Sequence, residues 1–198
     1  MTQPETHPWN YFAPQGSKIL FVGTFPPARQ RWSYDFFYPT KANFFWRILA
    51  AISLKKLQYD AGPDAVDERK ALLQQLHIAI TDMGQQIERS NNSSLDENIS
   101  VTKYMDILSI LKQHPGIGKI VFTSSGGPVS AAKWFIQYLR QHDLQHRFPA
   151  GSKPLHSEIV LNGRRISLAI VSSPSPRAAN RYPFDSLVKM YASEIENI

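Results

Sequence analysis

Residues 19–27 read Ile19-Leu20-Phe21-Val22-Gly23-Thr24-Phe25-Pro26-Pro27, an apolar run followed by a glycine turn. Such a run predicts a buried strand, and Gly23 marks the point where the chain leaves it. A second apolar run, residues 166–171, is followed by Ser172-Ser173-Pro174-Ser175-Pro176. Loops at the carboxyl ends of parallel strands meet at one edge of a sheet and form the ligand crevice. We therefore expect the two loops to be the two halves of one pocket.

The rest of the chain alternates between strand and helix patterns. Two more strands are expected at residues 77–81 and 119–123, and Asn162-Gly163 predicts a hairpin between residues 159–161 and 166–171. Helices are expected at 43–54, at 64–76 with Asp64 as its cap, from Ser100 or Thr102 to Gln113, at 128–140 and at 184–196. The polar stretch 90–100 and residues 141–154 are expected to be loops. This order predicts one α/β domain, a three-layer α/β/α sandwich with a central, mostly parallel four-stranded sheet, preceded by an N-terminal extension at residues 1–17.

The composition excludes several kinds of site. The 198 residues contain no cysteine, which excludes disulfides, thiolate zinc sites, iron–sulfur clusters and cysteine nucleophiles. The six histidines lack the spacing of a helical metal site, so we expect no metal and no cofactor. The formal charge of +6 favours a polyanionic partner, of which nucleic acid is the commonest. No apolar run is long enough to span a membrane and residues 1–8 lack a signal-peptide core, so a cytoplasmic protein is expected.

The loop after Gly23 is rich in aromatic residues and leads to Asn43 at the start of a helix. The flat faces of Phe37 and Tyr38 could stack on a nucleobase, an interaction worth about 1–3 kcal/mol per base, or they could pack in the core. Asn43 could take part in chemistry or could only cap its helix. These alternatives stay open on the sequence alone.

Residues 19–27, with Phe37-Tyr38, Asn43 and Phe45-Trp46, resemble the uracil-DNA glycosylase superfamily, and most closely its hypoxanthine-DNA and mismatch-specific uracil glycosylases. The Ser/Pro-rich loop from Val171 to Arg177 resembles the second motif of those enzymes. The resemblance spans residues 18–195. It implies that Asn43 is catalytic, because the third residue of the first motif is Phe25, which cannot position a water. Pro27 in place of glycine, and Thr40-Lys41 in place of His-Pro, are further departures.

The resemblance also implies a set of binding residues. Those for the base are Gly23, Thr24, Phe25, Phe37, Tyr38 and Asp82, and those for DNA are Ser173, Pro174, Ser175, Arg177 and Lys41. For several of them a simpler role is open: Asp82 could cap a turn, residues 173–176 could be a rigid loop without a ligand, and Lys41 and Arg177 could be solvated.

The function that the resemblance implies is monofunctional DNA glycosylase activity in base-excision repair. The enzyme would flip uracil or hypoxanthine out of DNA, hydrolyse its N-glycosidic bond without a cofactor, and act as a monomer on DNA that contains damaged or deaminated bases. Two other functions are consistent with the sequence. One is a catalytically inactive nucleic-acid-binding module on the same fold. The other is an α/β enzyme of free nucleosides, for which the positive charge would be superfluous.

Overall fold

The larger of two sheets has five strands in the order β3-β2-β6-β8-β7. The structure is a computed structural model that describes residues 4–89, 99–127 and 129–196. Strands β3 (Ile78–Asp82), β2 (Ile19–Gly23), β6 (Lys119–Phe122) and β8 (Arg164–Ile170) are parallel to one another. Strand β7 (Leu155–Leu161) forms the predicted hairpin with β8 and adds a fifth, antiparallel strand. The predicted α/β class is confirmed. The four strands of the predicted sheet correspond to the four parallel strands β3, β2, β6 and β8.

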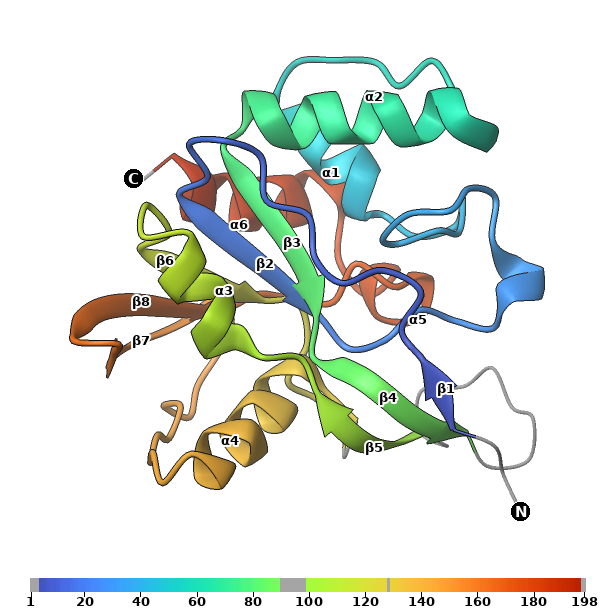
Figure 1. Ribbon diagram of the computed structural model, residues 1–198. Coiled ribbons are helices and arrows are strands. Elements are labelled where there is room, and N and C mark those ends of the chain that lie inside the picture. The colour runs from blue at the N-terminus through green and yellow to red at the C-terminus, as the bar shows by residue number, and fades with distance from the viewer. Residues whose placement is uncertain (1–3, 90–98, 128, 197–198) are drawn as a thin grey trace.

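Helices cover both faces of this sheet, which makes the expected three layers (Figure 1). Helices α1 (Phe45–Ile52), α2 (Gly62–Gln75) and α6 (Phe184–Ile195) lie on one face, and α3 (Ile107–Gln113) and α4 (Ala131–Gln141) lie on the other. Strand β2 supplies both cores in alternation, Phe21 facing α1 and α6 while Leu20 and Val22 face α3 and α4. A strand buried on both faces must be apolar at every position, which accounts for the continuous run in the sequence.

A second, antiparallel sheet was not anticipated from the sequence. It has the order β1-β4-β5, from β1 (Glu5–Thr6), β4 (Gly84–Arg89) and β5 (Ile99–Tyr104). The prediction of a helix starting at Ser100 or Thr102 is therefore wrong. The segment is rich in residues that favour strands, namely Ile99, Val101, Thr102 and Tyr104. The helix begins at Ile107, where the Asp106 carboxylate accepts the Ser109 N–H at 3.0 Å. Of the polar stretch expected to be a loop, residues 90–98 lie outside the described residues.

Three other helices begin at different residues from those predicted. Helix α1 begins at Phe45, two residues after Asn43. Helix α2 begins at Gly62 with Ala61 as its N-cap, so Asp64 lies in the first turn and is not the cap. Helix α4 begins at Ala131 after Ser130. Two short helices, η1 (Arg29–Arg31) and α5 (Pro176–Ala179), lie within the long loops.

The strand register brings the carboxyl ends of the parallel strands to one level. Gly23 pairs with Asp82 of β3, Val22 pairs with Phe122 of β6, and Phe122 pairs with Ile170 of β8. The segments that follow Gly23, Phe122 and Ile170 therefore leave the sheet together. We call this border the carboxyl edge.

None of the helices in the described part of the chain combines the length and the apolar character needed to cross a bilayer.

Phe21 tests the packing of the core. It is fully buried, stacked on Tyr191 at 5.9 Å between ring centroids and set edge-on to Phe45 at 5.6 Å. We expect Phe21→Ala to lower the free energy of unfolding by about 3–5 kcal/mol, because it removes apolar contacts and leaves a cavity. Val160→Ala, at a side chain that is 62% exposed, is the control and should change it by less than about 0.5 kcal/mol. Urea denaturation measures both, and equal effects would contradict this packing.

Candidate functional site

Gly23, the last residue of β2, is the floor of a polar cluster at the carboxyl edge. A Cβ atom on Gly23 would lie 2.1 Å from Asp82 Oδ1 and 3.1 Å from the Tyr38 hydroxyl. These two polar groups thus occupy the space that any other residue would fill with its own side chain. In the turn that follows, the Thr24 and Phe25 N–H groups donate no hydrogen bond to any residue that the structure describes.

Asp82 ends β3 and is held by a residue from the N-terminal segment. His7 Nε2 lies 2.9 Å from Asp82 Oδ2, and the two side chains are 1% and 9% exposed. The other carboxylate oxygen, Oδ1, has no hydrogen-bond donor among residues 4–89, 99–127 and 129–196. An ionised carboxylate only accepts hydrogen bonds. The cluster therefore offers one unused acceptor directly over Gly23.

Tyr38 is fixed through its backbone, its ring and its hydroxyl. Its φ of 49° is in the left-handed region, and the Tyr34 hydroxyl donates to its carbonyl at 2.6 Å. Its ring stacks on Phe45 at 4.1 Å. The Thr123 hydroxyl donates to the Val22 carbonyl at 3.3 Å, so the Tyr38 hydroxyl is the donor in the 2.8 Å bond that joins it to Thr123.

Burial keeps the hydroxyls of this loop protonated. It raises the pKa of Tyr38 far above its ordinary value, and the negative charge of Asp82 adds to that rise. Burial also raises the pKa of Tyr34 to about 12. Both groups therefore remain hydrogen-bond donors throughout the physiological pH range.

Phe25 and Phe37 are packed in the interior and present no open ring face. Phe37 is 1% exposed and contacts the rings of His7, Trp9 and Phe36 at centroid distances of 5.7, 5.2 and 5.2 Å. Phe25 is 7% exposed and lies edge-on to His7 at 5.2 Å. Of the two roles considered for Phe37, the structure gives it the core-packing one. Both rings help to enclose the His7–Asp82 pair.

Asn43 lies where the first loop meets the last one. The Phe44 N–H donates to the Pro174 carbonyl at 2.8 Å, which joins the two loops that the sequence predicted to be neighbours. The N-cap residue of α1 is Phe44, and the Asn43 Oδ1, one residue before it, accepts the Phe45 N–H at 2.9 Å and so satisfies the first N–H of the helix. Its side-chain NH₂ has no acceptor in the described parts of the chain. The capping role is therefore real, and it leaves the half-buried amide with unused donors.

Of the residues predicted to contact DNA, Arg177 and Lys41 are exposed, Ser173 and Ser175 are half-buried, and Pro174 is buried. Ser173 Oγ accepts the Ser175 N–H at 3.2 Å, and the Ser175 carbonyl accepts the Ala178 and Ala179 N–H groups at the start of α5. Lys41 lies 3.5 Å from Asp60 in a solvated ion pair, which contributes little to stability.

Sequence reasoning missed the residues that organise the site from a distance. His7 stands alone among polar neighbours in the sequence, and no spacing marks it as a partner of Asp82. Trp46 was expected in the core, but its Nε1–H also donates to the Phe37 carbonyl at 2.9 Å. No motif or spacing in the sequence marks Tyr34 or Thr123 as part of a site. Only the fold brings these groups to the carboxyl edge.

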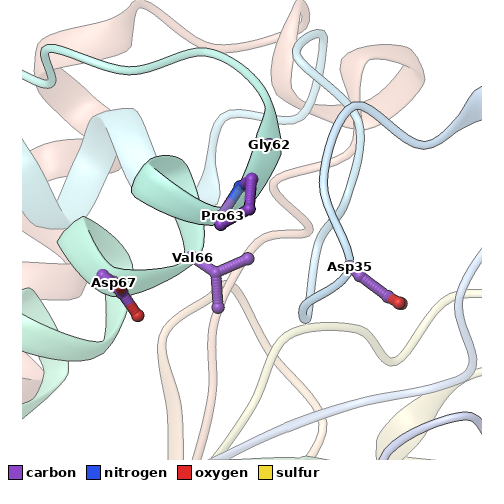
Figure 2. Close-up of a pocket in the computed structure, with 5 residues that line it drawn as sticks. All are labelled: Asp35, Gly62, Pro63, Val66 and Asp67. Carbon is purple, nitrogen blue, oxygen red and sulfur yellow. The ribbon is translucent and has the colours of Figure 1, made fainter.

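Two surface depressions lie apart from the Asn43–Pro174 junction. One of about 300 Å³ is formed by Asp35 and the start of α2, where Gly62, Pro63, Val66 and Asp67 line it (Figure 2). The other, of about 310 Å³, is lined by residues 6–10 with Gln85 and Met105 and borders His7. The described residues include no group of three or more histidine or acidic side chains arranged to hold a metal ion.

Gly23→Ala tests the close approach over β2. We expect it to lower the free energy of unfolding by about 1–3 kcal/mol, because the new methyl group must displace Asp82 Oδ1. Gly118→Ala is the matched control, since a Cβ there has no atom within 4 Å. Adding Asp82→Ala to the Gly23 variant should restore part of the loss. Equal melting temperatures for the Gly23 and Gly118 variants would contradict the geometry described.

Comparison with known proteins identifies the fold and leaves the family unassigned. No protein-family model matches the chain, and no curated protein matches it. Among solved structures, the chain is similar to the solution NMR structure of a candidate uracil DNA glycosylase from Methanosarcina acetivorans. The two are 16% identical and superpose with a TM-score of 0.59 over 98% of this chain and 100% of the other. This chain therefore has the same overall fold as that protein.

Proposed function

We propose that this protein is a monofunctional DNA glycosylase that removes a deaminated base, uracil or hypoxanthine, from DNA. The observation that carries the proposal is the hydrogen bond from Phe44 to Pro174, which joins the two predicted pocket loops. It sets the side-chain NH₂ of Asn43, which has no acceptor among the described residues, beside the loop of Ser173 and Ser175. The shared fold with a candidate uracil DNA glycosylase supports it, as does the charge of +6. One fold hosts many functions, so the function is inferred from the residues of the site and not from the fold alone.

In this proposal the flipped base enters at the carboxyl edge. Tyr38 stacks on the base with the ring face that Phe45 does not cover. Asp82 Oδ1 accepts the ring N–H that uracil and hypoxanthine share. Cytosine and adenine carry a lone pair on that ring nitrogen, which a carboxylate repels. Flipping costs a few kcal/mol and least for a mispaired base, which adds to the selection of deaminated sites.

The chemical step needs positioning more than a strong base. Asn43 holds a water against the anomeric carbon, whose bond to the base nitrogen breaks with both electrons leaving on the base. The water oxygen bonds to that carbon, and the water proton balances the charge of the departing base. The free N–H groups of Thr24 and Phe25 stabilise that charge as it develops. Holding water and sugar in line lowers the barrier without any cofactor.

Phosphate contacts hold the DNA in this register. Ser173 and Ser175 flank the extruded nucleotide, and the prolines between them reduce the conformational freedom lost on binding. Arg177 and Lys41 contact phosphates from the exposed rim. Such contacts give affinity without reading sequence.

One observation favours a second function, a nucleic-acid-binding module without catalysis. Phe25, at the third position of the first motif, is an apolar side chain buried against His7. Phe25 therefore contributes no polar atom that could hold a water. If Asn43 does not hold one either, the same surface binds DNA and leaves it intact.

Asn43 variants test the chemical role separately from the capping role. We expect Asn43→Ala to lower the rate of base release by roughly 10²–10³-fold, the effect of losing one positioned donor, and to lower stability by about 1 kcal/mol through the lost cap. Asn43→Asp keeps an acceptor for the Phe45 N–H but loses the NH₂ group. Asn43→Asp should therefore melt at the wild-type temperature while its rate of base release falls. Single-turnover release of base from oligonucleotides with one deoxyuridine or deoxyinosine measures the rate.

Gln141→Ala, which removes an exposed amide from the end of α4, is the control and should act like the wild type. Wild-type binding without base release would support the binding module instead. Release from free nucleosides without salt-sensitive DNA affinity would support a nucleoside enzyme.

Arg177→Ala tests the DNA contact. We expect weaker binding to all sequences and a slope of log affinity against log salt that is smaller by about 1, because one phosphate contact releases about one counterion. Fluorescence anisotropy over a salt series measures it. Arg140→Ala, on α4, should leave the slope unchanged. The same slope in both variants would exclude Arg177 from the contact.

A further inference from the structure

Residues 5–12, which we call the N-terminal strap, are built into both sheets (Figure 1). Thr6 pairs with Gln86 of β4, and the His7 N–H donates to the Gln85 carbonyl at 2.8 Å. Phe12 and Ile80 exchange two backbone hydrogen bonds, of 2.9 and 2.8 Å, at the edge of β3. The backbone of His7 is therefore fixed on both sides.

The imidazole of His7 is held just as firmly. His7 Nδ1 lies 3.1 Å from the Trp9 backbone nitrogen and also contacts the Trp9 carbonyl oxygen. The rings of Phe25, Trp9 and Phe37 surround it at 5.2, 5.6 and 5.7 Å. Because the ionised Asp82 only accepts, the hydrogen of the 2.9 Å bond is on His7 Nε2. A buried carboxylate without such a donor is costly.

This bond decides how the carboxylate of Asp82 is turned. With Oδ2 bound to His7, Oδ1 lies over Gly23 and has no donor among the described residues. If the imidazole were absent, the carboxylate could rotate or turn towards water. The direction of the free acceptor therefore depends on a residue 75 positions away in the sequence.

We propose that His7 is a positioning residue of the site and that the N-terminal strap belongs to the functional unit. This inference rests on the proposed function: His7 aims Asp82 Oδ1 at the ring N–H of a deaminated base and touches neither the base nor the sugar. A hydrogen bond from a residue that does not touch the ligand can keep a recognition group in its productive geometry. The strap thus contributes to substrate selection, although its sequence has no motif.

His7→Leu and His7→Gln separate the donor from the packing. The amide nitrogen of glutamine can replace Nε2 as a donor to Oδ2, and leucine cannot donate at all. We expect kcat/KM for the uracil- or hypoxanthine-containing oligonucleotide to fall at least about tenfold in His7→Leu, the scale of one lost charge-assisted hydrogen bond, and to stay within about threefold in His7→Gln. His156→Leu is the control: it breaks a similar bond to Glu194, at 2.8 Å on the outer strand β7, and should leave kcat/KM unchanged.

A double-mutant cycle distinguishes positioning from a general structural effect. If His7 acts through Asp82, His7→Leu should have no further effect on kcat/KM in an Asp82→Asn background. Rates are measured well below the melting temperature of each variant, and His7→Asn, whose amide stops short of Oδ2, replaces leucine if that variant does not fold. Wild-type activity in both His7→Leu and His7→Asn, or fully additive losses, would overturn the role of His7 alone. A wild-type protein that releases no base would overturn the proposed function and this role with it.

Discussion

The arrangement at the carboxyl edge depends on the missing side chain of Gly23. With a Cβ there, Asp82 Oδ1 would be 2.1 Å away and could not stay, and the Tyr38 hydroxyl would be crowded at 3.1 Å. The position of Asp82 in turn defines the partner of His7, and the position of Tyr38 defines the route of the loop at residues 24–44. The absence of one Cβ atom thus allows the close approach of groups from three segments that are distant in the sequence.

Side chains packed around the first loop hold its backbone at several points. The Trp46 indole and the Tyr34 hydroxyl hold the carbonyls of Phe37 and Tyr38, and the Phe44 N–H ties the end of the loop to Pro174. Preorganised groups of this kind need little rearrangement when a ligand arrives. Among the described residues at this edge, the groups without hydrogen-bond partners include an acceptor on Asp82, a donor pair on Asn43, two peptide N–H groups and the hydroxyl of Ser172. Both donors and acceptors are thus available, as the edge of a nucleobase requires.

The sequence predicted the central sheet and its helices but not the second, antiparallel sheet. The continuous apolar runs of β2 and β8 and the turn at Asn162-Gly163 made the parallel sheet and its hairpin predictable. Residues 99–104 were misread because their link to the polar stretch before them hid their content of residues that favour strands. At the site, the proximity of Asn43 and the Ser173–Pro176 loop could be predicted from the sequence, because parallel strands end at one edge of the sheet. The partnership of His7 with Asp82 could not, since it depends on how a polar N-terminal segment pairs with β4. Nor could the burial of Phe37, since an aromatic residue in a loop serves equally well as a core residue or as a stacking surface.

A crystal structure of the protein with free uracil or hypoxanthine is the most direct test of the central claim, that the groups around Gly23 form a base-binding site. We expect density for the base against the face of Tyr38 that Phe45 does not cover, with the ring N–H of the base within hydrogen-bond distance of Asp82 Oδ1 and with Asn43 at its border. A base bound elsewhere would contradict this claim. So would a carboxyl edge that holds no base at saturating base concentration while the Tyr38 hydroxyl keeps its hydrogen bond to Thr123.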